Sequence, residues 1–505
     1  MNKPGVCLGA VACIAVAGGG AAHAFCGFYV SGSGAKLSND ATQVVLMRDG
    51  TRTVLSMQND FKGPLEDFAM VVPVPVVLKE ADVKTLPRTV FSNTDSLGSP
   101  RLVEYWEEDP CPIARPKEEM EMRAYGSSAG MAMDGDEGGA RRKDTVKIEA
   151  KFDVGEYKIL ILSATEAAGL ETWLKANKYK IPDGAEPLLR PYVEAGSKFF
   201  VAKVDPKKVT MEGNHAALSP LRFHYDSEDF ALPIRLGMAN SSGKQDLIVN
   251  IISADKRFEV ANYKNVFIPT NFDVKPAVKT RFAEFYAALF DKTIEANPGA
   301  VVTEYAWTAV PNYHCDPCTD ADITNPDLIT LGGDVVGGPI AGGNFVLTRL
   351  HARYGKNDMK DDLRFREAKP VTGGREQWTK QGIEYGAAPS AQNYFQARYA
   401  IRHWWTGPIK CKNPQRGVWG GPPDGSYQPT IAAPKLAFAP RGKIAVSSMV
   451  GRDLWEIGLK KDRPTPPPAP PSKTSGGVKA MSFGALGGLV LLGLGLSVAR
   501  RRRDP

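Results

Sequence analysis

Five of the seven cysteines lie beyond residue 24, and their thiols are the side chains most able to do covalent chemistry. Cys315 and Cys318 stand in Cys-Asp-Pro-Cys, a spacing that suits a structural disulfide, a redox pair or, with His314, part of a metal site. A redox pair needs a helix that begins at its first thiol, but Asn325-Pro326 follows too soon for a long one. A metal site needs a second ligand pair at close spacing, and none is present. We predict a disulfide, with a thiol–disulfide oxidoreductase as the alternative.

The other three of these cysteines are far apart in the chain. Cys26 and Cys111 lie at the two ends of a strand-rich block, so we predict that they form a disulfide across it. Cys411 is then the odd thiol, either free or joined to another molecule. Disulfides are expected because both ends of the chain indicate export to an oxidising compartment.

Two predicted strands, at 345–354 and 394–403, carry basic side chains on an outer face and apolar side chains on the opposite face. If the strands are neighbours, like charges would lie opposite one another and destabilise the pair unless an acidic group lies between them. One possibility is an internal acid, namely Asp361, Asp362 or Glu367. The other is an external carboxylate, phosphate or sulfate that the guanidinium groups of the arginines bind in bidentate fashion. The basic residues of this candidate anion site are Arg349, His351, Arg353, Arg398 and Arg402.

Other motifs of catalysis are missing from the sequence. It has no G-x-S-x-G elbow, no phosphate-binding G-x-x-x-x-G-K-[ST] loop and no H-E-x-x-H. A hydrolase triad could still be assembled in space from scattered residues, so a hydrolase remains an alternative. We therefore assign no catalytic residue, metal or cofactor. The histidines beyond residue 24 are His215, His224, His314, His351 and His403.

The composition is that of an ordinary globular protein. The chain has 505 residues, 43% of them hydrophobic and 24% charged, enough for substantial cores and against wholesale disorder. Its formal net charge of +7 is concentrated at the ends, where four arginines stand at 500–503. The long middle is nearly neutral, which argues against a nucleic-acid partner.

Both ends look like targeting segments. Residues 1–24 combine Lys3, an apolar run and Ala22-His23-Ala24, which predicts a signal peptide cleaved before Phe25. Residues 461–479 form a proline-rich stalk, and 480–499 form an apolar helix whose uncharged residues 481–499 reach roughly 28 Å, enough to span a membrane. The arginines of 500–505 would stay in the cytoplasm, which places the rest outside. The tail also resembles bacterial Gly-Gly-type sorting signals, so it is either a permanent anchor or a surface-sorting signal.

Between the ends we expect a strand-rich subdomain at 25–114, a disordered insertion at 115–145 and an α+β domain at 146–460. Arg48-Asp49-Gly50 between apolar runs predicts a hairpin. Ser163-x-x-Glu166 indicates a capping box that opens a helix to about 175. Further helices are predicted at 186–194 and 279–295, the second with an aromatic stripe that indicates core packing. The predicted fold class is α+β, with mainly antiparallel or mixed sheets and one transmembrane helix.

The chain resembles an uncharacterised bacterial family, domain of unknown function 2330, over most of 25–405. The matching segments are CGFYV at 26–30, 39–50, DFAMVVPVP at 67–75, RLVEY at 101–105, EYAW at 304–307, CDPC at 315–318 and TRLHARY at 348–354. The resemblance implies an exported protein of Gram-negative-type bacteria and brings no activity. We therefore expect an envelope protein with a binding or structural role, in contact with the membrane through its C-terminal helix and with an anionic ligand or a protein partner. An envelope enzyme is the alternative.

Overall fold

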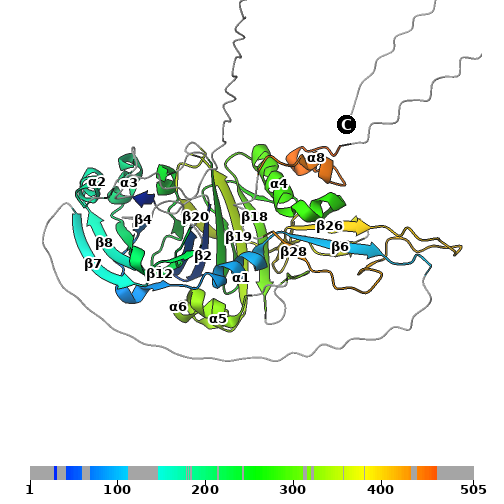
Figure 1. Cartoon of the computed structure of the whole chain (residues 1–505), viewed down its shortest axis with the longest axis horizontal. Coiled ribbons are helices and arrows are strands. Elements are labelled where there is room, and N and C mark those ends of the chain that lie inside the picture. Colours follow the sequence, from blue (N-terminus) through cyan, green and yellow to red (C-terminus); the bar gives the residue numbers. More distant parts are fainter. Residues whose placement is uncertain are drawn as a thin grey trace, which may run out of the picture. The chain divides into compact units, whose positions relative to one another are not determined.

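The structure is a computed structural model of the full chain (Figure 1). A compact unit ends at Asp462. The predicted signal peptide, insertion, stalk and membrane helix lie outside the described residues, and no helix among those described is long and apolar enough to cross a membrane. The structure describes residues 28–30, 41–59, 69–111, 146–177, 179, 181, 185–212, 215–240, 244–310, 315–319, 323–355, 358–379, 382–433 and 441–462.

A large mixed sheet runs through the middle of the unit (Figure 1). Its β2–β3 hairpin is the predicted one, with Gly50 at φ 53° in the turn, a conformation that glycine adopts without strain. In spatial order the strands are β24 (Ala388–Pro389), β21 (Val371–Gly373), β25 (Tyr394–Gln396), β18 (Val301–Ala309), β19 (Phe345–Tyr354), β14 (Gln245–Ser253), β2 (Ala41–Asp49), β3 (Arg52–Asn59), β12 (Leu221–Asp226) and β5 (Val83–Thr85), with β16 (Asn265–Phe267) also on β18.

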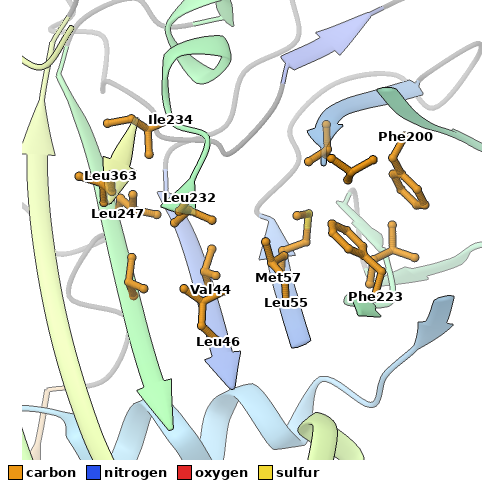
Figure 2. Close-up of a cluster of buried hydrophobic side chains, with 14 of the residues drawn as sticks. Val44, Leu46, Leu55, Met57, Phe200, Phe223, Leu232, Ile234, Leu247 and Leu363 are labelled. Atoms are coloured by element: carbon orange, nitrogen blue, oxygen red, sulfur yellow. The ribbon is translucent and has the colours of Figure 1, made fainter. Parts of the chain in front are cut away.

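A second sheet packs against one face of the first. Figure 2 shows the apolar core between them, where Val44 and Leu55 of the large sheet and Phe200 of the second sheet contribute side chains. Helices α2 (Ala167–Ala176) and α3 (Glu186–Glu194) cover the outer face of the second sheet. Its strands, in order, are β1 (Phe28–Val30), β4 (Ala69–Val74), β9 (Lys198–Val204), β8 (Tyr157–Ala164) and β7 (Val146–Val154).

The other face of the large sheet is covered partly by α4 (Phe282–Ala296), which follows the 3-10 turn η4 (Pro276–Arg281), and partly by α1 (Thr89–Gly98), α5 (Asn325–Leu328) and α7 (Gly338–Ala341). The predicted aromatic stripe of α4 is buried, as Phe285 and Tyr286 are fully enclosed. Strand β19 is therefore covered on both of its faces. The expectation that its basic side chains lie on an outer face is wrong, because α4 covers the side to which they point.

A third sheet extends away from the large one (Figure 1). The chain leaves the large sheet after β25 and enters the third sheet one residue later as β26, with Ala397 between them. Strands β6 and β26 lie parallel, in a register that pairs Arg398 with Arg101. The strands are β17 (Phe272–Asp273), β26 (Arg398–His403), β6 (Arg101–Glu107) and β27 (Trp419–Gly420), with β28 (Ile431–Ala432) also on β6.

The other elements are short. They are α1 (Thr89–Gly98), α5 (Asn325–Leu328), α6 (Asp334–Val336), α7 (Gly338–Ala341), α8 (Val446–Met449), η1 (Glu80–Asp82), η2 (Pro206–Lys208), η3 (Arg235–Asn240), the π-turn η5 (Ile329–Gly333), η7 (Trp455–Ile457), the three-stranded sheet β13 (Ala231–Leu232), β20 (Leu363–Ala368) and β15 (Arg257–Val260), and the hairpins β10 (Thr210–Glu212) with β11 (His215–Ala217) and β22 (Trp378–Thr379) with β23 (Gly382–Ile383).

The mixed α+β class agrees with the prediction. The segments expected as separate units at 25–114 and 146–460 share sheets, since β2 lies between β14 and β3. The helix expected to open at a capping box starts later, at Ala167, because the Ser163 hydroxyl belongs to β8 and donates to Glu149 of β7 at 2.5 Å. Because the Ser163 hydroxyl bonds to the neighbouring strand, it is not available to cap the helix.

Candidate functional sites: a buried charge network and an arginine–tryptophan surface

The first candidate site is a network of charged side chains between β19 and α4. Glu304 of β18 is its centre and is completely buried. Its carboxylate accepts hydrogen bonds from Arg349 Nε at 2.7 Å and from Tyr286 Oη at 2.8 Å, and lies 2.7 Å from His351 Nδ1. A second carboxylate, that of Asp95 on α1, accepts from Arg349 Nη1 at 2.5 Å. Arg349 is thus held between two carboxylates with no exposed surface.

The network continues from His351 towards solvent. His351 Nε2 lies 3.0 Å from Asp246 Oδ1, and the imidazole stacks on Phe290 with ring centres 3.8 Å apart. Asp246 also accepts from Arg353 and from Arg441. Both ring nitrogens of His351 face carboxylates, so the imidazole is suited to hold a proton rather than to abstract one from a substrate.

A pocket of about 320 Å³ lies at the outer end of the network. Arg353 lines it together with Asp291 of α4, which also accepts a hydrogen bond from Arg441. Lys244 and Asp358 stand on the rim and form an ion pair at 3.7 Å. The charged side chains of the lining therefore already have partners of opposite sign, and Ile294, Pro298 and Gly299 form the apolar part of the wall.

The charged groups of the network shift one another's pKa values in the direction opposite to the shift that burial alone would cause. Burial alone would raise the pKa of Glu304, but His351 and Arg349 outweigh it and lower the pKa to about 2. Burial would lower the pKa of His351, and Glu304 together with Asp246 raises it above its ordinary value instead. The Asp246 carboxyl behaves like Glu304, since cationic neighbours lower its pKa against the effect of burial. The carboxylates at both ring nitrogens thus favour the protonated form of His351, and the cationic and anionic groups of the network neutralise one another.

These shifts predict how stability depends on pH. Glu304, with an ordinary pKa of 4.5, contributes stability that is complete above pH 4.5 and is lost as the pH falls towards 2. His351, with an ordinary pKa of 6.5, contributes stability that is complete below pH 6.5 and is lost as the pH rises through its raised pKa. We expect His351→Gln to unfold more easily at pH 6 and to lose much less stability than the unmodified protein on the alkaline side. Melting temperatures across the pH range test this, and parallel alkaline limbs would contradict it.

The second candidate site is formed around Arg398 and Arg402 of β26. Arg398 donates to Glu376 and, at 2.6 Å, to Tyr105 Oη. Arg402 donates to Asp273 through Nε at 3.0 Å and to Glu376 through Nη2 at 3.1 Å. Burial alone would raise the pKa of Glu376, but the two guanidinium groups lower it.

Tryptophan rings surround these ion pairs. The Arg402 guanidinium carbon lies 5.4 Å from the centre of the Trp378 ring and 4.8 Å from that of Trp419. Trp404 meets Trp419 edge to face, with centres 4.9 Å apart, and Arg416 lies 5.7 Å from the Trp404 ring. We call these five residues the arginine–tryptophan surface. Trp378 is 55% exposed and Trp404 is 56% exposed.

A buried carboxylate and a disulfide hold the loop between β26 and β27, which carries Trp404 and Arg416 of this surface. Glu107, at the end of β6, accepts hydrogen bonds from both Nε and Nη2 of Arg416 and from the backbone N–H groups of Trp405 and Gly417, at 2.7 to 3.0 Å. The Arg416 guanidinium lowers the pKa of Glu107 to about 2. Cys111 is joined to Cys411 a few residues beyond. Chain segments about 300 residues apart are thereby fixed side by side.

The structure separates the five basic residues of the predicted anion site into two groups. The predicted strands are not neighbours, because β18 lies between β19 and β25, and β26 belongs to another sheet. Every one of the five has a carboxylate within ion-pair distance, which favours internal neutralisation over a waiting anion site. The acids differ from those expected: Asp362 pairs with Arg235 instead, and the partners come from distant segments. These partners are Asp95, Asp246, Asp273, Asp291, Glu304 and Glu376.

The cysteines follow the prediction in one case and depart from it in another. Cys315 and Cys318 are joined by a disulfide, and Cys315 is buried. In the described residues the first helix after this pair begins at Asn325, so neither thiol has the helix start that redox chemistry would need. The expected Cys26–Cys111 bond is wrong for Cys111, because β6 pairs with β26 and β27 and so brings it to Cys411. Cys26 lies outside the described residues.

No cluster of three or more histidine, cysteine or acidic side chains in the described part of the chain is arranged to hold a metal ion. No curated protein and no solved structure matches the chain. Residues 20–366 match the model of an uncharacterised protein family conserved in bacteria, DUF2330. That match covers more than half of the sequence and agrees with the resemblance of the motifs quoted above. The chain therefore belongs to the DUF2330 family.

Proposed function

We propose that this chain is an exported protein of the bacterial cell envelope that acts by binding, and that the arginine–tryptophan surface is its binding surface. The observation that carries the proposal is the exposure of two tryptophans near Arg402: Trp404 on the disulfide-held loop after β26, and Trp378 on the β22–β23 hairpin. Tryptophan and arginine are the residues most enriched where binding energy is concentrated. A single exposed aromatic ring is common on protein surfaces. Several rings that are held together by guanidinium groups are instead typical of an interaction site.

Two features support export. The first 24 residues have the pattern of a signal peptide. All four cysteines that the structure describes form disulfides, as expected of proteins in oxidising compartments and unusual in the reducing cytosol. The apolar segment 480–499 and the arginines after it would tether the protein to the membrane or mark it for sorting to the surface.

Export is tested by protease treatment of spheroplasts that express the full chain. We expect external protease to remove the domain, and peptide mapping without reduction to recover Cys111 joined to Cys411. A matched variant without residues 2–24 should be protected and should carry both cysteines as thiols. Protection of the full chain in intact spheroplasts would contradict the proposal.

Binding is tested by photo-cross-linking in the same cells. A photoreactive phenylalanine analogue in place of Trp404 should give adducts of higher mass. The same analogue in place of Trp455, which is 67% exposed on the separate turn η7, is the control and should give few adducts. Equal yields at the two positions would exclude the arginine–tryptophan surface as the binding surface.

A further inference from the structure

We propose that the arginine–tryptophan surface binds a neutral polysaccharide by stacking sugar rings on its tryptophans. This inference rests on the proposed function and adds the class of ligand. Its first support is shape. Trp404 and Trp419 meet at an interplanar angle of 75°, so their rings form two walls of a corner, and Trp378 shares with Trp419 the contact to the Arg402 guanidinium group. An extended ligand can therefore meet more than one flat ring.

The rings are fixed before any ligand arrives. The Trp378 indole N–H donates to Glu376 Oε1 at 2.9 Å, which sets the orientation of that ring. Arg402, whose side chain is 5% exposed, supports Trp378 and Trp419 from beneath through its guanidinium group. A surface that is already ordered loses little conformational entropy on binding, and aromatic side chains provide a large contact area at low entropic cost.

The charges of the surface favour a neutral ligand. Arg402 is neutralised by Asp273 and Glu376, and Arg416 by Glu107, so neither guanidinium group waits for an anion. The remaining exposed charges on the adjoining segments are of both signs. They are Lys410 and Lys412 before β27, Glu108 and Asp109 after β6, and Asp424 after β27. A polyanion such as an acidic glycan would gain no unpaired guanidinium group here.

Flat aromatic rings next to paired charged groups are suited to bind a sugar. One face of a pyranose ring presents C–H groups that stack on an aromatic face, while its hydroxyl groups lie at the edge and need hydrogen-bond partners. At this surface the exposed faces of Trp378 and Trp404 would take the C–H groups. Arg416, half exposed at its edge, would donate to the hydroxyl groups. An apolar protein partner would instead require a continuous apolar patch, which the ion pairs interrupt.

The test is a titration of the full-length purified protein with neutral oligosaccharides, followed by tryptophan fluorescence and calorimetry. The probes are hexamers of α- and β-linked glucose and of β-linked N-acetylglucosamine. We expect saturable binding of at least one probe that changes little between about 50 and 500 mM NaCl, since no ion pair with the ligand is screened. Trp404→Ala should weaken binding about tenfold or more, whereas Trp455→Ala should not change it.

The Trp404→Phe variant and the photo-cross-links separate the possible outcomes. Trp404→Phe retains a flat ring, so it should recover part of the affinity if stacking is the cause, and it guards against a folding defect in the alanine variant. If no neutral probe binds, the glycan inference is overturned. Cross-links from position 404 to a protein would then leave the proposed function standing with a protein ligand. If neither glycan binding nor cross-links are found, both proposals fail.

Discussion

Replacing Glu304 with alanine is expected to lower the free energy of unfolding by about 3–5 kcal/mol, the range for breaking a buried ion pair. The substitution leaves Arg349 and His351 inside the protein without the carboxylate that both contact. The matched control is Glu186→Ala, which removes an exposed pair with Arg190 one helical turn away on α3. That change should cost less than about 1 kcal/mol. Urea titrations of the three proteins measure the difference.

A second substitution separates charge balance from lost packing. Arg349→Gln should also destabilise the protein strongly, because Glu304 and Asp95 would lose their shared cation. The double variant Glu304→Gln with Arg349→Gln should be less destabilised than the sum of the single changes, since partners in one network are coupled. A loss for Glu304→Ala as small as that for Glu186→Ala, or a strictly additive double variant, would show that the network does not stabilise the fold.

The second large effect is expected from the disulfide between Cys111 and Cys411. Replacing both cysteines with serine opens a loop of 300 residues, and chain entropy predicts a loss of roughly 5–6 kcal/mol. The matched control opens the Cys315–Cys318 disulfide, whose cysteines are 3 residues apart. It should cost no more than about 2 kcal/mol by the same argument. Thermal unfolding of both serine pairs gives the comparison.

The loss should also be localised. Because Cys411 lies in the loop between β26 and β27, opening its disulfide should increase hydrogen exchange around Trp404 and Trp419 before it affects α4. Equal losses of stability from the two serine pairs would contradict the entropic argument. Unchanged exchange in the loop would contradict its dependence on the disulfide.

Local structure could be predicted well wherever neighbouring residues decide it. The strand at 345–354 and the helix at 186–194 have the predicted bounds. An apolar alternation or a helical stripe depends on residues a few positions apart, so the sequence carries that information directly. The hairpin at Gly50 belongs to the same class, because the turn chemistry is contained in three residues.

Long-range pairing could not be predicted in the same way. Alternation along β19 showed that Arg349 and His351 share a face, but it could not show that α4 covers that face. Their partners Asp95 and Glu304 come from a helix and a strand far away in sequence. A signal did exist, since Glu304 stands inside the otherwise apolar run of β18, and a carboxylate in a buried strand requires a cation nearby.

The arginine–tryptophan surface was missed for a related reason. Trp404, Trp405 and Trp419 lie close in sequence, with Arg416 among them, and that density of aromatic residues is itself a signal. Whether such rings are buried or exposed depends on the third sheet, in which β6 and β26 pair across some 300 residues. The expected Cys26–Cys111 bond failed for Cys111 through the same long-range pairing.

The central claim is that the arginine–tryptophan surface is occupied when the protein is in the envelope. Hydroxyl-radical footprinting measures this directly, by comparing oxidation of Trp404 in living cells with that in the purified full-length protein. We predict that Trp404 is oxidised several-fold more slowly in cells, while Trp455, which is also exposed in the structure, shows no such protection. Equal oxidation rates of Trp404 in cells and in purified protein would contradict the account.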